Sequence, residues 1–91
     1  MVVFARQRDD GDSAAVRLGV TASRRVGNAV MRNRCKRRMR ELFRADAAAF
    51  DGLRVDVVIN ARHGCGEARW SELQGEYRRC ILKLTTRLAG R

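Results

Sequence analysis

The sequence predicts a small α+β protein: a two-layer α/β sandwich with helices on one face of a mixed sheet. Two kinds of apolar spacing support this prediction, since three segments follow strand patterns and two longer segments follow a helical period. The third observation is their order along the chain, which is strand, strand, helix, strand, helix. With 91 residues and no internal repeat, low-complexity stretch or linker, we expect residues 1–91 to form a single domain.

Three segments are expected to be strands. The first is Val2 to Gln7, and an exposed polar loop from Arg8 to Ala14 follows it. The second strand begins at Val16 and alternates between apolar and polar residues, as a half-buried strand does. We expect one of its faces to carry Val16, Leu18, Val20 and Ala22, and the other to carry Arg17, Gly19, Thr21 and Ser23. The third strand, Val55 to Ala61, is expected to be central because little of it is polar.

Two segments are expected to be helices. Gly27 and Asn28 supply a turn and an N-cap for a helix from Ala29 to about Arg44. Its apolar stripe comprises Met31, Cys35, Met39, Leu42 and Phe43. After a loop from His63 to Arg69, the run Ser71 to Gln74 fits a capping box at the start of a closing helix. The apolar face of that helix comprises Leu73, Tyr77, Cys80, Ile81, Leu84 and Leu88, and we interpret Trp70 and Tyr77 as packing residues.

The positive charge is concentrated on the first helix and the turn before it. Nine basic residues and one acid lie between Arg24 and Arg44, which gives this segment a net charge of +8 out of +10 for the chain. The cations Lys36, Arg37, Arg40 and Arg44 fall opposite the apolar stripe, together with Asn33. A solvated face is the ordinary explanation of a charge run, but here hardly any acid offsets the repulsion. The pattern therefore favours a polyanionic partner, with nucleic acid ahead of an anionic membrane surface.

Several function classes find no support. Three widely spaced cysteines without a C-x-x-C pair suit free thiols in the cytoplasm, and no apolar run or signal-peptide pattern suggests a membrane. His63 and Cys65 are too few for a zinc site, so we expect no metal site. Asp9, Asp10 and Asp12 could hold Mg²⁺ loosely, but a solvated turn is favoured. With one histidine and no acid/base dyad, we expect no protein active site.

These residues also carry a family resemblance. The run G-N-A-V-M-R-N-R-C-K-R-R-M-R-E, Gly27 to Glu41, resembles the signature of the bacterial ribonuclease P protein, which is built around an Arg-Asn-Arg core. The preceding strand, Arg17 to Val26, and the later Val55 to Arg62 are similar to the family's segments in the same order. The similarity covers nearly the whole chain. It implies a left-handed β-α-β crossover and a fold similar to domain IV of elongation factor G.

The resemblance implies the protein subunit of ribonuclease P, whose partners are a catalytic RNA and precursor tRNA. In this family the RNA subunit carries out the Mg²⁺-dependent endonucleolytic removal of the tRNA 5′ leader. The protein itself is expected to bind no cofactor, and no protein partner is evident. The residues that would contact RNA are Arg24, Arg25, Asn28, Arg32, Asn33, Arg34, Lys36, Arg37, Arg40 and Arg44. Those at the cleft for the leader are Val2, Phe4, Arg17, Thr21 and Ser23.

The chain departs from the family at its start. Family members usually begin with a further short helix and strand, and the helix forms one wall of the leader cleft. The expectation is either an N-terminally truncated or mis-started chain, or an altered leader site. Phe4 has two interpretations, a stacking residue in the cleft or a core residue on a strand.

Two other functions stay open at this point. A general RNA- or DNA-binding module, such as a chaperone or regulator, would show the same composition. A self-sufficient nuclease is the second alternative, and an assay without added RNA would separate it from a ribonucleoprotein subunit.

Overall fold

Three strands form one mixed sheet in the computed structural model, which describes residues 1–7, 16–50 and 54–89. The strands are β1 (Val2–Gln7), β2 (Val16–Ala22) and β3 (Val55–Ala61), and their order in the sheet is β1-β3-β2. β3 pairs with β1 antiparallel and with β2 parallel, so it is the central strand, as predicted. The predicted loop from Arg8 to Ala14, including Asp9, Asp10 and Asp12, lies outside the described residues.

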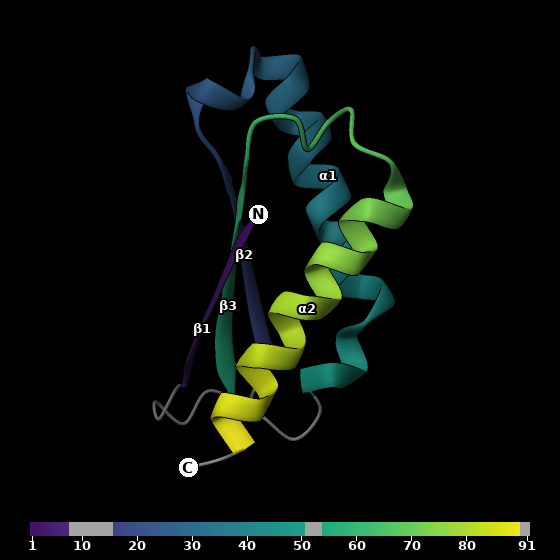
Figure 1. The fold of residues 1–91 in the computed structure, drawn as a ribbon. Coiled ribbons are helices and arrows are strands. Elements are labelled where there is room, and N and C mark those ends of the chain that lie inside the picture. The colour runs from purple at the N-terminus through teal and green to yellow at the C-terminus, as the bar shows by residue number, and fades with distance from the viewer. Residues whose placement is uncertain (8–15, 51–53, 90–91) are drawn as a thin grey trace.

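Two helices, α1 (Ala29–Ala45) and α2 (Trp70–Ala89), lie on the same face of this sheet (Figure 1). The predicted two-layer α+β architecture is therefore confirmed, together with the order of its elements. β2, α1 and β3 form a β-α-β crossover between parallel neighbours, and the left hand expected for it stays a prediction. Within the described ranges, neither helix has the length and apolar character that a membrane span requires.

The core fills the space between the sheet and the helices. Every second residue of β3 is buried beneath the helices, which is the period-two pattern of a strand with one covered face. The predicted apolar stripes of both helices pack against it. The buried side chains are Val55, Val57, Ile59 and Ala61 from β3, Cys35, Met39 and Leu42 from α1, and Leu73, Tyr77 and Ile81 from α2. Trp70 is half-buried and packs against this cluster.

The start of α1 is fixed by two residues of the predicted turn. The Asn28 side-chain oxygen accepts a hydrogen bond from the Met31 amide at 2.9 Å, so Asn28 is the N-cap. Gly27 has a φ of 147°, and a Cβ there would lie 3.0 Å from the Met31 side chain. A short 3-10 helix, η1 (Arg24–Val26), precedes this turn and was not predicted. Its Val26 is buried, which anchors the neighbouring arginines.

The predicted capping box at the start of α2 is wrong. The helix begins at Trp70, and the Arg69 carbonyl already accepts from the amides of Glu72 and Leu73 at 3.0 and 3.1 Å. Ser71 therefore lies inside the first turn and cannot be the N-cap. The physical reason is tertiary packing, because Trp70 is held against the core and beneath the Arg38 guanidinium, 5.8 Å from its ring centre.

Tyr77 gives a test of the core through its pH dependence. Burial, with smaller contributions from Asp46 and Cys80, raises the pKa of Tyr77 above its ordinary value of 10.0. Its hydroxyl has no hydrogen-bond partner among the described residues. A raised pKa means that the folded state keeps a proton that the unfolded chain releases. The contribution of protonated Tyr77 to the free energy of unfolding is therefore fully present below about pH 10 and is lost as the pH rises above it.

We therefore expect Tyr77→Phe to raise the free energy of unfolding by roughly 1 kcal/mol at pH 8, because no desolvated hydroxyl remains. The stability advantage of the variant should grow as the pH rises above 10. Urea unfolding at pH 8 and at pH 10.5 measures both effects. A variant that is less stable than the wild type at pH 8 would show that the hydroxyl has a partner.

Candidate nucleic-acid interface

The outer side of α1 presents a cationic stripe, defined here as Asn33, Arg37, Arg40 and Arg44. All four are exposed, and their spacing places them on successive turns of one helix face. Arg32 and Lys36, one step around the helix, are half-buried. Because Cys35, Met39 and Leu42 fix the opposite side in the core, the stripe stands at set positions relative to the sheet. A rigid array of guanidinium groups suits contact with a folded polyphosphate.

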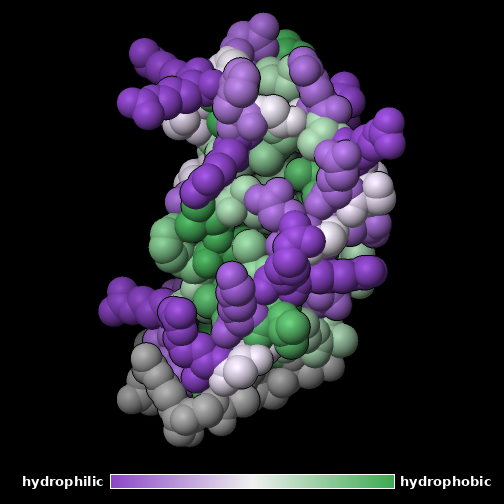
Figure 2. Space-filling view, viewed as in Figure 1, coloured by the Kyte–Doolittle hydropathy of each residue, from purple (hydrophilic) through white to green (hydrophobic). Residues whose placement is uncertain are grey.

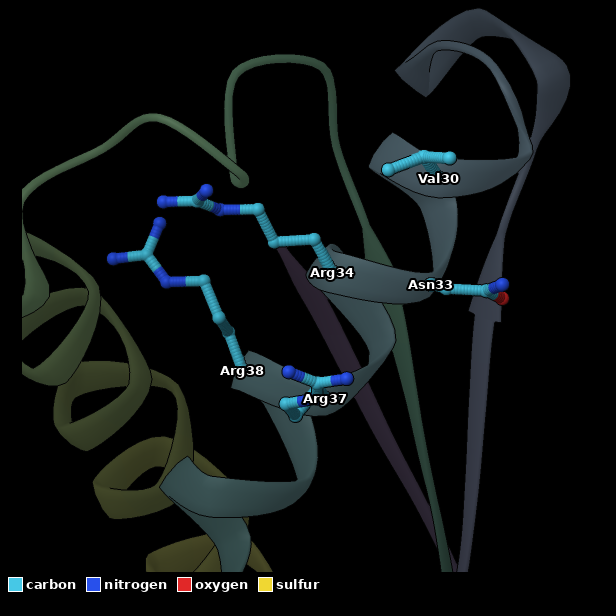
Figure 3. A pocket seen from close by; sticks show the side chains of 5 residues that line it. All are labelled: Val30, Asn33, Arg34, Arg37 and Arg38. Atoms are coloured by element: carbon cyan, nitrogen blue, oxygen red, sulfur yellow. The ribbon is translucent and has the colours of Figure 1, made fainter.

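The cations of α1 do not all point the same way. Figure 3 shows Arg34 and Arg38 extending toward the segment that joins β3 to α2, while Asn33 points to the opposite side of the helix. With Val30 and Arg37 they line a shallow depression on the helix surface. Val30 is 79% exposed, so an apolar side chain is accessible to a partner within this charged surface.

Arg38 has a structural role that the charge count alone does not reveal. Its two terminal nitrogens donate to the carbonyls of Cys65 and Ala68 at 2.5 and 2.6 Å. The guanidinium also lies over the Trp70 ring. Arg38 therefore ties α1 to the β3–α2 loop and is the one cation of α1 with a described partner in the protein.

A second surface lies on the other side of the sheet, called here the open face because both helices cover the opposite side (Figure 1). The strand register places three residues in line across its middle, Phe4 of β1, Val58 of β3 and Gly19 of β2. One neighbouring row is Val2, Asn60 and Thr21, in which the Thr21 hydroxyl donates to the Asn60 side chain. The other row is Arg6, Asp56 and Arg17.

Phe4 belongs to this open face and not to the core. Its side chain is 55% exposed, whereas Val3, the next residue along β1, packs against the core. The alternative that Phe4 is a core residue is therefore wrong. Gly19 lies beside Val58 and adds no side chain, so Phe4 and Val58 form an apolar strip between the row of Val2, Asn60 and Thr21 and the charged row. An exposed aromatic ring with a cation close by, here Arg6 two residues along the same strand, is typical of single-stranded nucleic acid sites.

The two surfaces meet at the end of the molecule where β2 runs into η1. Ser23, Arg24 and Arg25 are all exposed there, between the open face and the start of α1. Figure 2 shows hydrophilic side chains projecting from this end of the molecule. The His63 Nδ1 lies 3.2 Å from the Arg25 carbonyl, so the β3–α2 loop also reaches this place.

Comparison with known proteins shows the family of the chain. The family model described as Ribonuclease P matches residues 1–85. This chain belongs to the ribonuclease P protein family. The ribonuclease P protein component of Ruegeria pomeroyi is 57% identical over 85 residues, covering 92% of this chain and 68% of the relative. That of Gluconacetobacter diazotrophicus is 39% identical over 87 residues, covering 96% and 73%.

A solved structure of the ribonuclease P family has the same fold. The Staphylococcus aureus RNase P protein superposes with a TM-score of 0.69 at 29% identity, covering 90% of this chain and 71% of that chain. The residues expected from the family resemblance accordingly fall into two groups in space. Val2, Phe4, Arg17 and Thr21 share the open face, and the α1 cations lie on the helix layer, with Ser23 to Arg25 between them.

Five residues of the open face were not among the site residues expected from the sequence. Arg6, Gly19, Asp56, Val58 and Asn60 line up with the predicted residues across the three strands, and of these only Gly19 was already expected on the same strand face as Arg17 and Thr21. Asp56, Val58 and Asn60 alternate with the buried residues of β3, and this alternation is the signal that could have identified them. The alternation is hard to recognise in the sequence because most residues of this segment are apolar.

The thiols and the single histidine do not form a ligand cluster. Within the part of the chain that the structure describes, no three His, Cys, Asp or Glu side chains gather as a metal site would need. Cys35, Cys65 and Cys80 are unpaired. Burial, and after it the neighbouring Cys65, raise the pKa of the Cys35 thiol, which keeps it protonated near neutral pH.

Proposed function

We propose that this chain is the RNA-binding subunit of a ribonuclease P, which removes the 5′ leader of precursor tRNA. The observation that carries the proposal is the pairing of two surfaces on one rigid fold, a cationic helix and an open sheet face, in a chain of this family. The proposal assigns the first surface to the catalytic RNA and the second to the leader.

The α1 surface supports binding of a structured RNA. Among the described residues, no carboxylate pairs with the guanidinium groups of Arg37, Arg40 or Arg44, so their charge is available to phosphates. Arg24 and Arg25 extend the positive surface beyond the helix. Asn28 caps α1 with its side-chain oxygen, which leaves its amide nitrogen for an RNA contact. Contacts of this kind give affinity that falls steeply with salt.

The open face supports binding of a single strand without sequence preference. Phe4 provides a ring on which a base can stack, and Arg17 and Thr21 offer polar contacts on either side. A leader has no fixed sequence among precursor tRNAs, so stacking and phosphate contacts suit it better than base-edge readout. Ser23 and the two arginines after it would lie where the leader meets the catalytic RNA.

The chemistry is assigned to the RNA subunit with its Mg²⁺ ions, and the protein is proposed to bind no cofactor. Its part is to reduce repulsion between phosphates, stabilise the active RNA fold and hold the leader. A cytoplasmic location is part of the same proposal, in keeping with three unpaired cysteines.

Reconstitution tests this function. The purified chain alone should not cleave precursor tRNA, and adding it to the cognate catalytic RNA should lower the Mg²⁺ concentration needed for correct 5′ maturation. The reason is that protein cations replace part of the counterion screening. The measurement is the cleavage rate against Mg²⁺ concentration for RNA alone, protein alone and both together.

The two alternatives predict other results in the same assay. Robust cleavage by protein free of RNA would identify a self-sufficient nuclease. A general RNA-binding module would bind bulk duplex RNA as well as the catalytic RNA and leave the Mg²⁺ requirement unchanged.

A further inference from the structure

The β3–α2 loop, residues 62–69, is a rigid element docked on α1. It is closed by its own hydrogen bonds, from the Cys65 amide to the Arg62 carbonyl at 3.1 Å and from the Ala68 amide to the Gly64 carbonyl at 3.0 Å. Cys65 is 4% exposed, so the loop is seated in the core by its own side chain. A segment built in this way keeps its exposed side chains in fixed places.

Contacts with α1 hold the loop against the helix. Arg38 donates to the Cys65 and Ala68 carbonyls, and a Cβ on Gly66 would lie 2.2 Å from the Met31 sulfur. The Met31 side chain would therefore have to move to admit any larger residue at position 66. On the far side, the contact between His63 and the Arg25 carbonyl joins the loop to η1.

This docking adds two arginines to the positive surface at the end of the molecule. Arg62 and Arg69 are exposed, as are Arg24 and Arg25 across the His63 contact. Glu67 is the one exposed carboxylate of the loop, and the ion pairs found among the described residues include none of these five side chains. The loop thus adds two exposed cations next to those of η1 and α1, against the single exposed acid Glu67 on the loop.

We infer that the loop is a second contact element for the RNA phosphate backbone, and that Arg38 is the positioning residue that holds it in line with α1. The inference rests on the proposed function, since it extends the surface assigned to the catalytic RNA. The docking of the loop on α1 favours the catalytic RNA over precursor tRNA as its partner. Arg38 itself acts through the loop, because each of its terminal nitrogens donates to a loop carbonyl.

The first test removes the two loop cations from the full chain. Arg62→Ala/Arg69→Ala should weaken binding to the cognate catalytic RNA and flatten the plot of log affinity against log salt by about one unit per lost phosphate contact. The matched control is Arg78→Ala/Arg79→Ala, which removes two exposed arginines of α2 with the same change in net charge. The control should bind with a nearly unchanged slope. Circular dichroism confirms that both variants are folded.

The second test separates positioning from charge. Arg38→Lys keeps the cation but loses the planar fork that reaches two carbonyls, so the loop should loosen and RNA affinity should fall. In the Arg62→Ala/Arg69→Ala background the same change should have a much smaller effect, because the loop no longer carries contacts. A purely structural role of Arg38 would give equal effects in both backgrounds.

The possible results separate a failure of the loop assignment from a failure of the proposed function. If the wild-type chain shows no salt-dependent binding to the catalytic RNA, the proposed function itself fails. If the wild type binds and the loop variant behaves like the α2 control, only the loop inference is overturned. It is also overturned if the loop variant loses affinity for precursor tRNA in the assembled enzyme while binding the catalytic RNA normally.

Discussion

Replacing Arg37 and Arg40 with Ala should weaken binding to the catalytic RNA and flatten its salt dependence by roughly two slope units, about one for each lost phosphate contact. When salt rises from about 50 to 200 mM, the wild type should therefore lose about tenfold more affinity than the variant loses over the same range. Both side chains are exposed on the cationic stripe and have no carboxylate partner among the described residues, so folding should be little affected. Filter binding over a salt series measures the slope.

The control for this double variant is again Arg78→Ala/Arg79→Ala, whose loss of charge is the same but lies on α2. Thermal unfolding of both variants should stay close to that of the wild type. If Arg37→Ala/Arg40→Ala unfolds while its folded fraction binds RNA normally, the cationic stripe stabilises the fold and does not contact the RNA.

The elements of the fold were predictable because each has a local signal. α1 and α2 follow a 3.6-residue period over many turns, and Asn28 occupies an N-cap position that local chemistry favours. β3 was expected at the centre because nearly all of it is apolar, and both of its edges are paired. Local signals of this strength survive in the folded state because tertiary packing agrees with them.

The arrangement of the site depends on contacts that no local pattern contains. Phe4, Val58 and Gly19 come together only because β1 runs antiparallel and β2 parallel to β3, and a shift by one residue would turn each strand over. Arg38 reaches carbonyls 27 and 30 residues away in the sequence. From its position in a charge run it was indistinguishable from its neighbours, although it serves a different purpose.

The α2 boundary shows the same limit on a smaller scale. Ser71 to Gln74 matches the sequence pattern of a capping box, but this local pattern contains no information on how the preceding loop packs. Trp70 is held by the core and by Arg38, so the helix starts before the serine. Long-range packing therefore decided the boundary against a locally favourable cap.

Phe4→Ala should reduce the affinity of the assembled enzyme for precursor tRNA by about 1–3 kcal/mol, the usual contribution of one stacked base. Affinity for mature tRNA, which lacks the leader, should be nearly unchanged. The 55% exposure of Phe4 rules out the larger stability loss that truncating a core phenylalanine brings, so the variant should fold normally. Equilibrium binding of both RNAs to the wild-type and variant enzymes measures the selectivity.

Three further variants separate base stacking from apolar contact and from nonspecific hydrophobic binding. Phe4→Tyr keeps an aromatic ring and should retain most of the affinity for precursor tRNA, whereas Phe4→Leu keeps apolar area without a π-face and should lose much of it. Leu82→Ala is the matched control, because Leu82 is 67% exposed on α2 and lies away from the open face. Equal losses for precursor and mature tRNA in Phe4→Ala would remove Phe4 from the leader site. Loss of selectivity in Leu82→Ala as well would move that site from the open face toward α2.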